Sequence, residues 1–171
     1  GEQKVSLELI AKDLQMADRL YVHSVDDLNR LKKIGLVNNV VYFPQGLMPT
    51  LPIVSDSKIQ SAKKKIIASY GFLLPHKGIQ ALIKAFIILA GKDQNLHLML
   101  VNSLYPVAES ENELHQCNVL IAQANLSHRV SVFSDYLADE ESQALLQKAD
   151  LIIYPYQKTQ ESSSAAVRMG L

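Results

Sequence analysis

The second part of the chain alternates short apolar runs with segments of helical periodicity, and this alternation restricts the fold more than any other feature. The runs are apolar without alternating polar residues, which is typical of strands covered by helices on both faces of a parallel sheet. Strands separated by helices require right-handed parallel crossovers. The sequence therefore predicts an α/β fold, a Rossmann-like doubly wound parallel sheet over residues 63–171. The expected strands are Lys65–Tyr70, Leu96–Val101, Val130–Phe133 and Leu151–Tyr154.

The helices expected between these strands each carry one apolar face. The first begins after Gly78 and stops at Gly91, and the third opens on Asp139 with acidic residues that suit the positive end of the helix dipole. The faces expected to be buried comprise Ile79, Leu82, Ile83, Phe86 and Ala90 in the first helix, and Leu114, Cys117, Ile121 and Ala124 in the second.

Residues 1–46 are predicted to form a separate segment. Its clearest local signal is a helix capped by Ser24, with Asp27 three residues on as a variant of the capping box. Residues 47–62 contain prolines and a Ser-Asp-Ser run without helical or strand periodicity, so they are predicted to be a linker. The short strands expected in the first segment are Arg19–His23 and Val40–Phe43.

The loops that follow the four later strands are expected to converge on one edge of the sheet. Parallel strands all end at the same edge, and open α/β folds bind their ligands there. Functional residues are therefore expected in these loops. The loops are 71–77, 102–106, 134–138 and 156–161.

The loop after the last expected strand leads into a helix that opens on Glu161 and three serines. A helix N-terminus presents unpaired N–H groups and a partial positive charge to a phosphate, and hydroxyl groups add donors. A carboxylate beside them suits sugar hydroxyls better than phosphate oxygens. The pattern indicates an anion and sugar site, while simple helix capping explains one serine more readily than three. The serines are Ser162, Ser163 and Ser164.

Charge and cysteine content exclude several classes of protein. The 171 residues include 17 basic and 17 acidic side chains, so no strong basic field favours nucleic-acid binding. Cys117 is the single cysteine, which rules out an internal disulfide, and no cluster of Cys and His has metal-ligand spacing. The first residues given lack the apolar core that is typical of a signal peptide, and the longest apolar run is too short to span a bilayer. We expect a cytoplasmic protein, with peripheral membrane association left open.

Six short motifs occur in order along the chain: Tyr70–Gly78, Leu98–Val101, Arg129–Phe133, Tyr136–Glu141, Ala149–Asp150 and Glu161–Ser164. Together they resemble the C-terminal domain of GT-B-fold glycosyltransferases, particularly the retaining group called glycosyltransferase family four. The resemblance covers roughly residues 63–171 and depends on the order and spacing of the motifs. Residues 17–24 and 40–46 resemble the end of the N-terminal domain of such an enzyme and the crossover into its second domain.

The resemblance implies roles for individual residues. Lys77 corresponds to the lysine that neutralises the donor diphosphate, and Glu161 corresponds to the first glutamate of a Glu-x7-Glu signature that faces hydroxyls of the transferred sugar. Residues 162–164 occupy positions whose backbone amides face the diphosphate or the sugar. Without the resemblance, spacing alone favours a solvated lysine in a first helical turn for Lys77, and an ordinary acidic residue that interacts with the helix dipole for Glu161. With it, both are predicted catalytic residues.

The chain differs from the family pattern at three positions. Met169 stands where the second glutamate of the signature is expected, Phe72 where a basic residue is common, and Asn102 where a glycine is common. Phe72 and Asn102 belong to the predicted donor-binding set, together with Gly71 and Tyr136. Tyr136 follows the third of the later strands, where it can stack on a base or pack over the sheet edge.

The resemblance implies a retaining hexosyltransferase that uses a nucleotide-diphosphate-sugar donor. The acceptor is expected to be a carbohydrate or a lipid-linked molecule of polysaccharide biosynthesis, bound by an N-terminal domain that is mostly missing, so the chain itself is expected to be an inactive fragment. No metal or other cofactor is required, because the positive charge comes from the protein.

Two other interpretations stay open. A non-catalytic Rossmann-like interaction module, flavodoxin-like or a degenerate transferase domain, is favoured by Phe72 and Met169 and opposed by the clustering of Lys77 and Glu161 in loops at one edge. The other open interpretation is a different GT-B enzyme, such as a sugar phosphorylase or a nucleotide-sugar epimerase.

Overall fold

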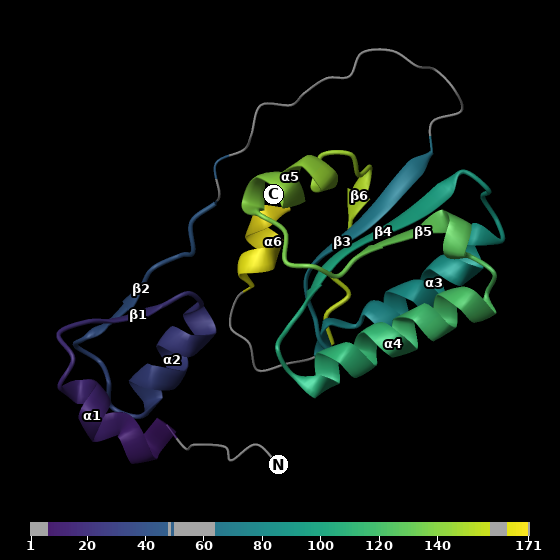
Figure 1. Cartoon of the computed structure of the whole chain (residues 1–171). Helices are drawn as coiled ribbons and strands as arrows, with labels where there is room; N and C mark the ends of the chain where they lie inside the picture. The colour runs from purple at the N-terminus through teal and green to yellow at the C-terminus, as the bar shows by residue number, and fades with distance from the viewer. Residues whose placement is uncertain (1–6, 48, 50–63, 158–163, 171) are drawn as a thin grey trace. The chain divides into compact units, whose positions relative to one another are not determined.

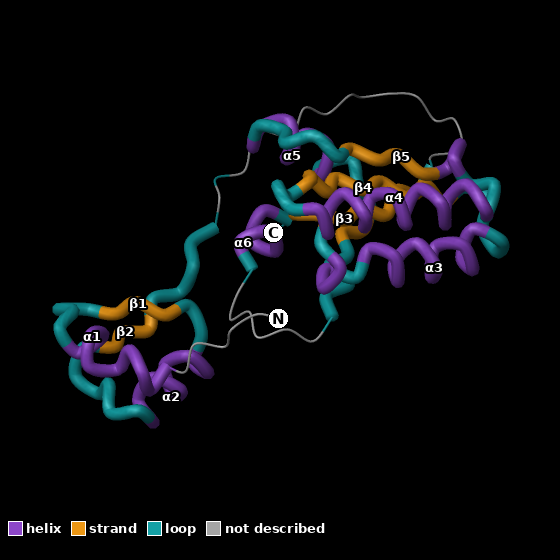
Figure 2. The backbone as a smooth tube through the Cα atoms, turned by 60° about the horizontal axis from the view of Figure 1, so that its bottom comes forward, coloured by secondary structure: helices purple, strands orange, loops and turns teal. Residues whose placement is uncertain are grey.

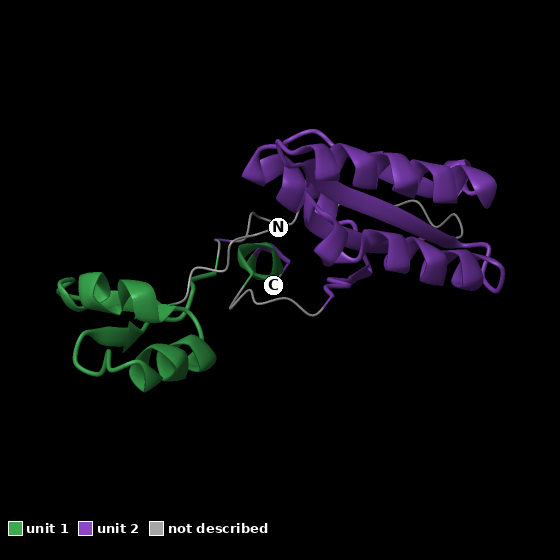
Figure 3. Cartoon of the chain, turned by 90° about the horizontal axis from the view of Figure 1, so that it is seen from below, with its two compact units in different colours: residues 1–47, 160–168 green, residues 48–159, 169–171 purple. Residues whose placement is uncertain are grey.

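The computed structural model divides the chain into two compact units, which Figure 3 colours separately. The first comprises residues 1–47 and 160–168, and the second comprises residues 48–159 and 169–171. The linker expected at residues 47–62 lies outside the described residues except at positions 47 and 49. The structure describes residues 7–47, 49, 64–157 and 164–170.

A four-stranded parallel sheet forms the centre of the second unit (Figure 1). Its strand order is β5-β4-β3-β6, so β3 is paired on both sides. The predicted α/β fold with a parallel, Rossmann-like sheet is confirmed. The strands are β3 (Lys65–Leu73), β4 (Leu96–Leu104), β5 (Val130–Phe133) and β6 (Leu151–Ile152).

Helices cover both faces of this sheet (Figure 2). α3 (Ile79–Ala90) and α4 (Ala108–Gln123) lie side by side on one face, and α5 (Asp139–Leu146) lies on the other. Each face has its own hydrophobic core, because neighbouring residues of a strand point to opposite sides. In β3, for example, Ile67 belongs to the core under α3 and α4, and Ala68 belongs to the core under α5.

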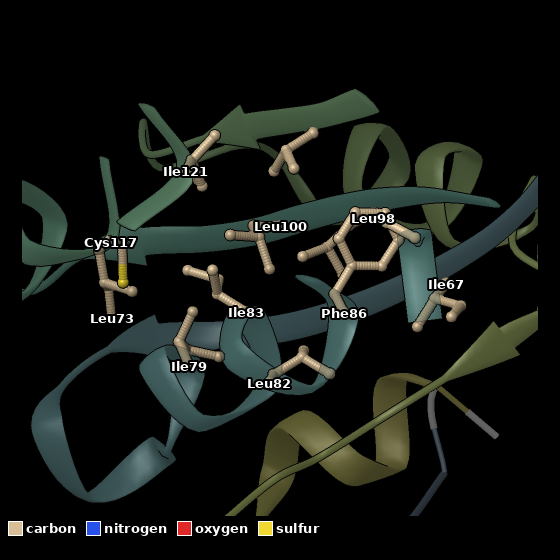
Figure 4. Close-up of a cluster of buried hydrophobic side chains, with 12 residues drawn as sticks. Ile67, Leu73, Ile79, Leu82, Ile83, Phe86, Leu98, Leu100, Cys117 and Ile121 are labelled. Atoms are coloured by element: carbon tan, nitrogen blue, oxygen red, sulfur yellow. The ribbon is translucent and has the colours of Figure 1, made fainter. Parts of the chain in front are cut away.

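The core under α3 and α4 follows from the apolar periodicity of the sequence (Figure 4). All five α3 residues predicted for the apolar face are buried. In α4 the prediction holds for Cys117 and Ile121, whereas Leu114 and Ala124 are only partly buried. Ser110 and Glu113 of α4 are buried instead, and Glu113 accepts a hydrogen bond of 2.7 Å from the side-chain amide of Gln80 in α3.

Two strands are longer than predicted. β3 and β4 were expected to end at Tyr70 and Val101, but they stay paired through Gly71↔Asn102 as far as Leu73↔Leu104. Polar side chains after position 101 were interpreted as a loop, yet a parallel ladder is held by backbone hydrogen bonds that any residue supplies. The loops expected at 71–77 and 102–106 therefore begin three residues later.

The last strand is shorter and more exposed than predicted. A buried central strand was expected over Leu151–Tyr154, but β6 contains only Leu151 and Ile152 and pairs with β3 alone among the described residues. Leu151 is 53% exposed. The apolar run alone did not distinguish a central strand from this edge position.

The first unit contains a two-stranded parallel sheet, in which β1 (Leu20–Val22) pairs with β2 (Val40–Tyr42). The predicted cap between them is confirmed. The Ser24 hydroxyl accepts a hydrogen bond of 3.1 Å from the backbone amide of Asp27 at the start of α2. The helical segments of this part of the chain are η1 (Leu7–Ile10), α1 (Ala11–Gln15) and α2 (Val25–Lys33), and the last helix of the chain is α6 (Ala165–Met169).

No helix in the described ranges is both long enough and apolar enough to cross a membrane.

A buried guanidinium group ties together three elements at the amino end of the sheet. Arg129, at the end of η3 (Ser127–Arg129), is only 7% exposed and packs near the ring of Phe86. It donates hydrogen bonds to four oxygen atoms, which belong to Ala90, Asp93, Gln94 and Leu96. The carbonyl of Ala90 is at the end of α3, and that of Leu96 is at the start of β4. A planar fork of five donors suits several acceptors at once better than the compact ammonium of lysine.

Arg129→Lys is therefore expected to lower the free energy of unfolding by about 2–4 kcal/mol, because buried carbonyl groups lose charged donors. Urea unfolding measures this loss. The matched control is Arg30→Lys at a side chain that is 52% exposed, where a change within about 0.5 kcal/mol is expected. Equal effects of the two substitutions would contradict the role assigned to Arg129.

Candidate site at the switch point of the sheet

The strand order creates a topological switch point between β3 and β6. The chain continues from β3 to β4 and β5 on one side, and then returns to place β6 on the other side of β3. Ligands of doubly wound sheets bind at the carboxyl ends of the strands beside such a point. The loops that follow β3 and β6 are therefore the first place to look for a site.

These two loops are in direct contact. The backbone amide of Gln157 donates a hydrogen bond of 2.8 Å to the carbonyl of His76. Gly78 has a φ of +73°, and a Cβ atom at this position would collide with the carbonyl oxygen of Pro155. The absence of a side chain at Gly78 lets the two loops approach each other.

Lys77 lies where the two loops meet. It ends the 3₁₀ turn η2 (Pro75–Lys77) directly before Gly78 and α3. Its Nζ atom is 4.3 Å from the centroid of the Tyr156 ring, and that ring makes an edge contact with Tyr154 at 5.8 Å between centroids. Lys77 was predicted at this strand-to-helix turn, but the sequence did not indicate Tyr156 as its neighbour.

Gly71, Phe72 and Asn102 lie within strands and not in the predicted loops. Gly71 has a φ of +126°, a value that favours glycine, and its carbonyl is 3.5 Å from the side-chain amide nitrogen of Asn102. Asn102 is only 2% exposed, and its side-chain oxygen has no hydrogen-bond partner among the described residues. Phe72 is 39% exposed and makes an edge contact with Tyr105 at 5.1 Å. The donor-binding roles of the three residues stay predictions.

Ser110 is a buried anchor at this edge that the sequence did not reveal. Its hydroxyl donates a hydrogen bond to the carbonyl of Leu73, the last residue of β3, and accepts one of 3.0 Å from the backbone amide of Tyr105. The end of β3, the loop after β4 and the first turn of α4 are thus joined through one oxygen atom. A serine in a first helical turn usually indicates an exposed position, which is why its burial was not predicted.

The loop after β5 is anchored to the end of β4. The carbonyl of Ser134 accepts a hydrogen bond of 2.9 Å from the amide of Leu104, and the carbonyl of Asp135 accepts one of 3.0 Å from the hydroxyl of Ser103. Tyr136 follows directly and is 79% exposed. Its ring is available for stacking, and its role in binding a base stays a prediction.

Three of the predicted site residues, Glu161, Ser162 and Ser163, lie outside the described residues. Ser164 directly precedes α6 and is half-buried. Among the residues that the structure does describe, no group of three or more His, Cys, Asp or Glu side chains could hold a metal ion.

Two half-buried tyrosines lie close to the switch point, in β3 and after β6. The pKa of Tyr154 is raised to about 12, mainly by burial and also by the neighbouring Tyr156 and Tyr70, while a backbone hydrogen bond with Gly170 acts to lower it. Burial also raises the pKa of Tyr70, and a hydrogen bond with Ser142 lowers it. Both hydroxyls therefore stay protonated at neutral pH and can act as hydrogen-bond donors.

Comparison with known proteins identifies the family. The model of the family described as "Glycosyl transferases group 1" matches residues 54–166, which is more than half of the chain. The chain belongs to this family. Curated protein sequences gave no match.

Solved structures resemble this group 1 glycosyl transferase chain in fold, at low sequence identity. Sucrose-phosphate synthase from Thermosynechococcus elongatus is 20% identical with a TM-score of 0.69, over 95% of this chain and 41% of the synthase. Anabaena HepE, in complex with UDP and glucose, is 15% identical with a TM-score of 0.59, over 85% of this chain and 41% of HepE. The C-terminal domain of a group 1 family glycosyl transferase from Francisella tularensis is 18% identical with a TM-score of 0.51, over 57% of this chain and 49% of that domain. The group 1 chain thus spans less than half the length of each.

Gly78→Ala is expected to lower the free energy of unfolding by about 2–4 kcal/mol, because it adds left-handed backbone strain to a collision with Pro155. Urea unfolding tests this. Gly91→Ala is the control, because Gly91 has a φ of −70° and a Cβ there would come no closer than 3.6 Å to a neighbouring atom. A Gly78→Ala protein as stable as the control would show that the two loops do not need to approach this closely.

The raised pKa of Tyr154 predicts a pH dependence of stability. Because this pKa is about 12 in the folded chain and 10.0 is its ordinary value, the folded state holds the proton more tightly, and the free energy of unfolding falls as pH rises between these values. Tyr154→Phe is expected to reduce this fall without removing it, because burial also raises the pKa of Cys117 to about 12. Urea unfolding near neutral pH and at about pH 11 measures the difference.

The control for the loss of a tyrosine hydroxyl is Tyr21→Phe, at a side chain that is 62% exposed. A fall of equal size in the Tyr154→Phe and wild-type proteins would contradict the assignment.

Proposed function

We propose that residues 63–171 belong to the donor-binding C-terminal domain of a GT-B glycosyltransferase of the family-four type, and that this part of the chain binds a nucleotide-diphosphate sugar. The observation that carries this proposal is the position of Lys77. Its ammonium group lies at the switch point of a doubly wound sheet, on a turn that contacts the loop after β6. Doubly wound sheets place their ligands at this point, and lysine is a common point charge for phosphate.

Catalysis in this proposal is mainly electrostatic. When the bond between sugar and diphosphate breaks, negative charge grows on the leaving diphosphate. Lys77 supplies positive charge there, and the first amides of α3 add to it because Gly78 provides no side-chain cap for them. Glu161 orients the sugar through its hydroxyls. The positive charge comes from the protein, so no metal ion is needed in this mechanism.

UDP-linked sugars are the first donors to consider, because the Anabaena structure of the same fold contains UDP and glucose. The proposed acceptor is a carbohydrate or a lipid-linked molecule in polysaccharide biosynthesis at the cytoplasmic side, and the proposed outcome is retention. Because the chain spans less than half the length of the similar structures, donor binding is proposed for this chain and complete sugar transfer for the whole protein.

Calorimetric titration tests donor binding directly, with UDP, GDP, ADP and their sugar conjugates as ligands. One diphosphate is expected to bind saturably. Lys77→Ala is expected to weaken it about 10- to 100-fold, which is the range for losing a hydrogen bond to a charged group. Glu161→Ala is expected to leave the affinity for the diphosphate unchanged and to remove the additional affinity that the sugar provides.

Lys84→Ala is the matched control, because Lys84 is an exposed lysine of α3 outside the proposed site. Its affinity for the diphosphate is expected to equal that of the wild-type chain. If none of the three diphosphates binds, the donor-binding proposal is wrong, and a non-catalytic interaction module becomes the better interpretation. Met169 supports that second candidate, because this residue packs in the core under α5.

A further inference from the structure

Lys77 contacts an aromatic face that a distant part of the chain contributes. The lysine follows β3 and Tyr156 follows β6, so the two meet only because the sheet places these strands side by side. A distance of 4.3 Å between Nζ and the ring centroid is within the range of a cation–π interaction.

Three contacts fix the ring of Tyr156 in this position. Its edge contact with Tyr154 has an interplanar angle of 74°. The next residue, Gln157, is hydrogen-bonded to His76, which is the neighbour of the lysine. The preceding residue, Pro155, packs its carbonyl against Gly78. The backbone on both sides of the ring is thus tied to the backbone on both sides of Lys77.

An aromatic face holds an ammonium group without cancelling its charge. The ring attracts the cation through its quadrupole, so this contact itself brings no opposite formal charge to the lysine. A carboxylate contact is different, as in the pairs Lys65–Asp93 and Arg30–Asp27, because it sets an opposite charge against the cation.

A lysine side chain loses considerable rotamer entropy when a ligand fixes it. A ring that restricts the side chain beforehand reduces this cost and raises affinity.

We propose that Tyr156 is a positioning residue for the recognition of a nucleoside diphosphate: its ring holds the Lys77 ammonium at the switch point. This inference depends on the proposed function, in which Lys77 binds the diphosphate. It predicts that an aromatic ring is required at position 156 and that the phenol hydroxyl is not.

The test is a double-substitution cycle in the 171-residue chain, read by calorimetric titration with the diphosphate that binds best. Tyr156→Leu is expected to weaken binding roughly two- to fivefold, the range for an exposed cation–π interaction, and Tyr156→Phe is expected to stay within twofold of wild type. In a Lys77→Ala background, Tyr156→Leu is expected to have no further effect, because the ring acts through the ammonium group. Thermal unfolding of each variant shows whether the fold is retained.

A second measurement reports the contact without any ligand. Reductive methylation with carbon-13 labels every lysine, and Lys77→Ala identifies the signal of Lys77. The ring current of Tyr156 is expected to displace this signal, Tyr156→Phe is expected to retain the displacement, and Tyr156→Leu is expected to remove it. A Lys77 signal at the position of the exposed lysines would overturn the inference.

The outcomes separate this inference from the proposed function. If the wild-type chain binds a diphosphate and Lys77→Ala weakens it, but Tyr156→Leu does not, the inference is wrong and the proposed function stands. If Tyr156→Leu weakens binding equally in the wild-type and Lys77→Ala backgrounds, the ring does not act through the lysine and the inference is again wrong. If no diphosphate binds to the wild-type chain, the proposed function fails and this inference fails with it.

Discussion

The second unit depends on the parallel pairing of β3 with β4, which continues without a break from Lys65↔Leu96 to Leu73↔Leu104. Both hydrophobic cores form on the two faces of this pair, and β5 and β6 join its two outer sides. The ends of the pair are fastened by polar side chains. At the amino end, the Arg129 guanidinium donates hydrogen bonds to backbone carbonyl groups. At the carboxyl end, the Ser110 hydroxyl donates a hydrogen bond to the carbonyl of Leu73 and accepts one from the amide of Tyr105. The register of these two strands therefore sets where the described loops after β3 and β4 begin at the carboxyl edge of the sheet.

The arrangement of Lys77 and Tyr156 at the switch point depends on contacts between the turn after β3 and the loop after β6. Neither segment provides it alone. The turn after β3 carries the cation, and the loop after β6 carries the ring and the backbone groups that hold it. This division explains why the close approach at Gly78 matters, since a side chain there would separate the cation from the ring. In the proposed function negative charge grows on the leaving diphosphate, and a cation that the fold already holds in place would meet this charge without reorganisation.

The strand and helix pattern was predictable where apolar residues form continuous runs or recur at helical spacing, and the contacts at the candidate site were predictable only in part. The buried face of α3 could be inferred because its apolar residues recur at helical spacing. The extension of β4 through Asn102 could not, because backbone pairing in a parallel ladder leaves no signal in side-chain polarity. The family resemblance singled out Lys77 as a candidate. Its contact with Tyr156 depends on which strands become neighbours, and spacing along the chain does not encode that. The predicted roles of Glu161, Ser162 and Ser163 fall outside the described residues.

The hydrogen bonds of Arg129 also have a consequence for the order in which the second unit assembles. Its guanidinium group donates hydrogen bonds to carbonyl groups at the end of α3, in the turn that follows and at the start of β4. The next residue along the chain begins β5. Burying this charge is favourable only when all of these acceptors are already in place. The docking of β5 is therefore expected to depend on the completed connection from α3 to β4. A partly assembled form that lacks α3 is expected to gain little stability from adding β5.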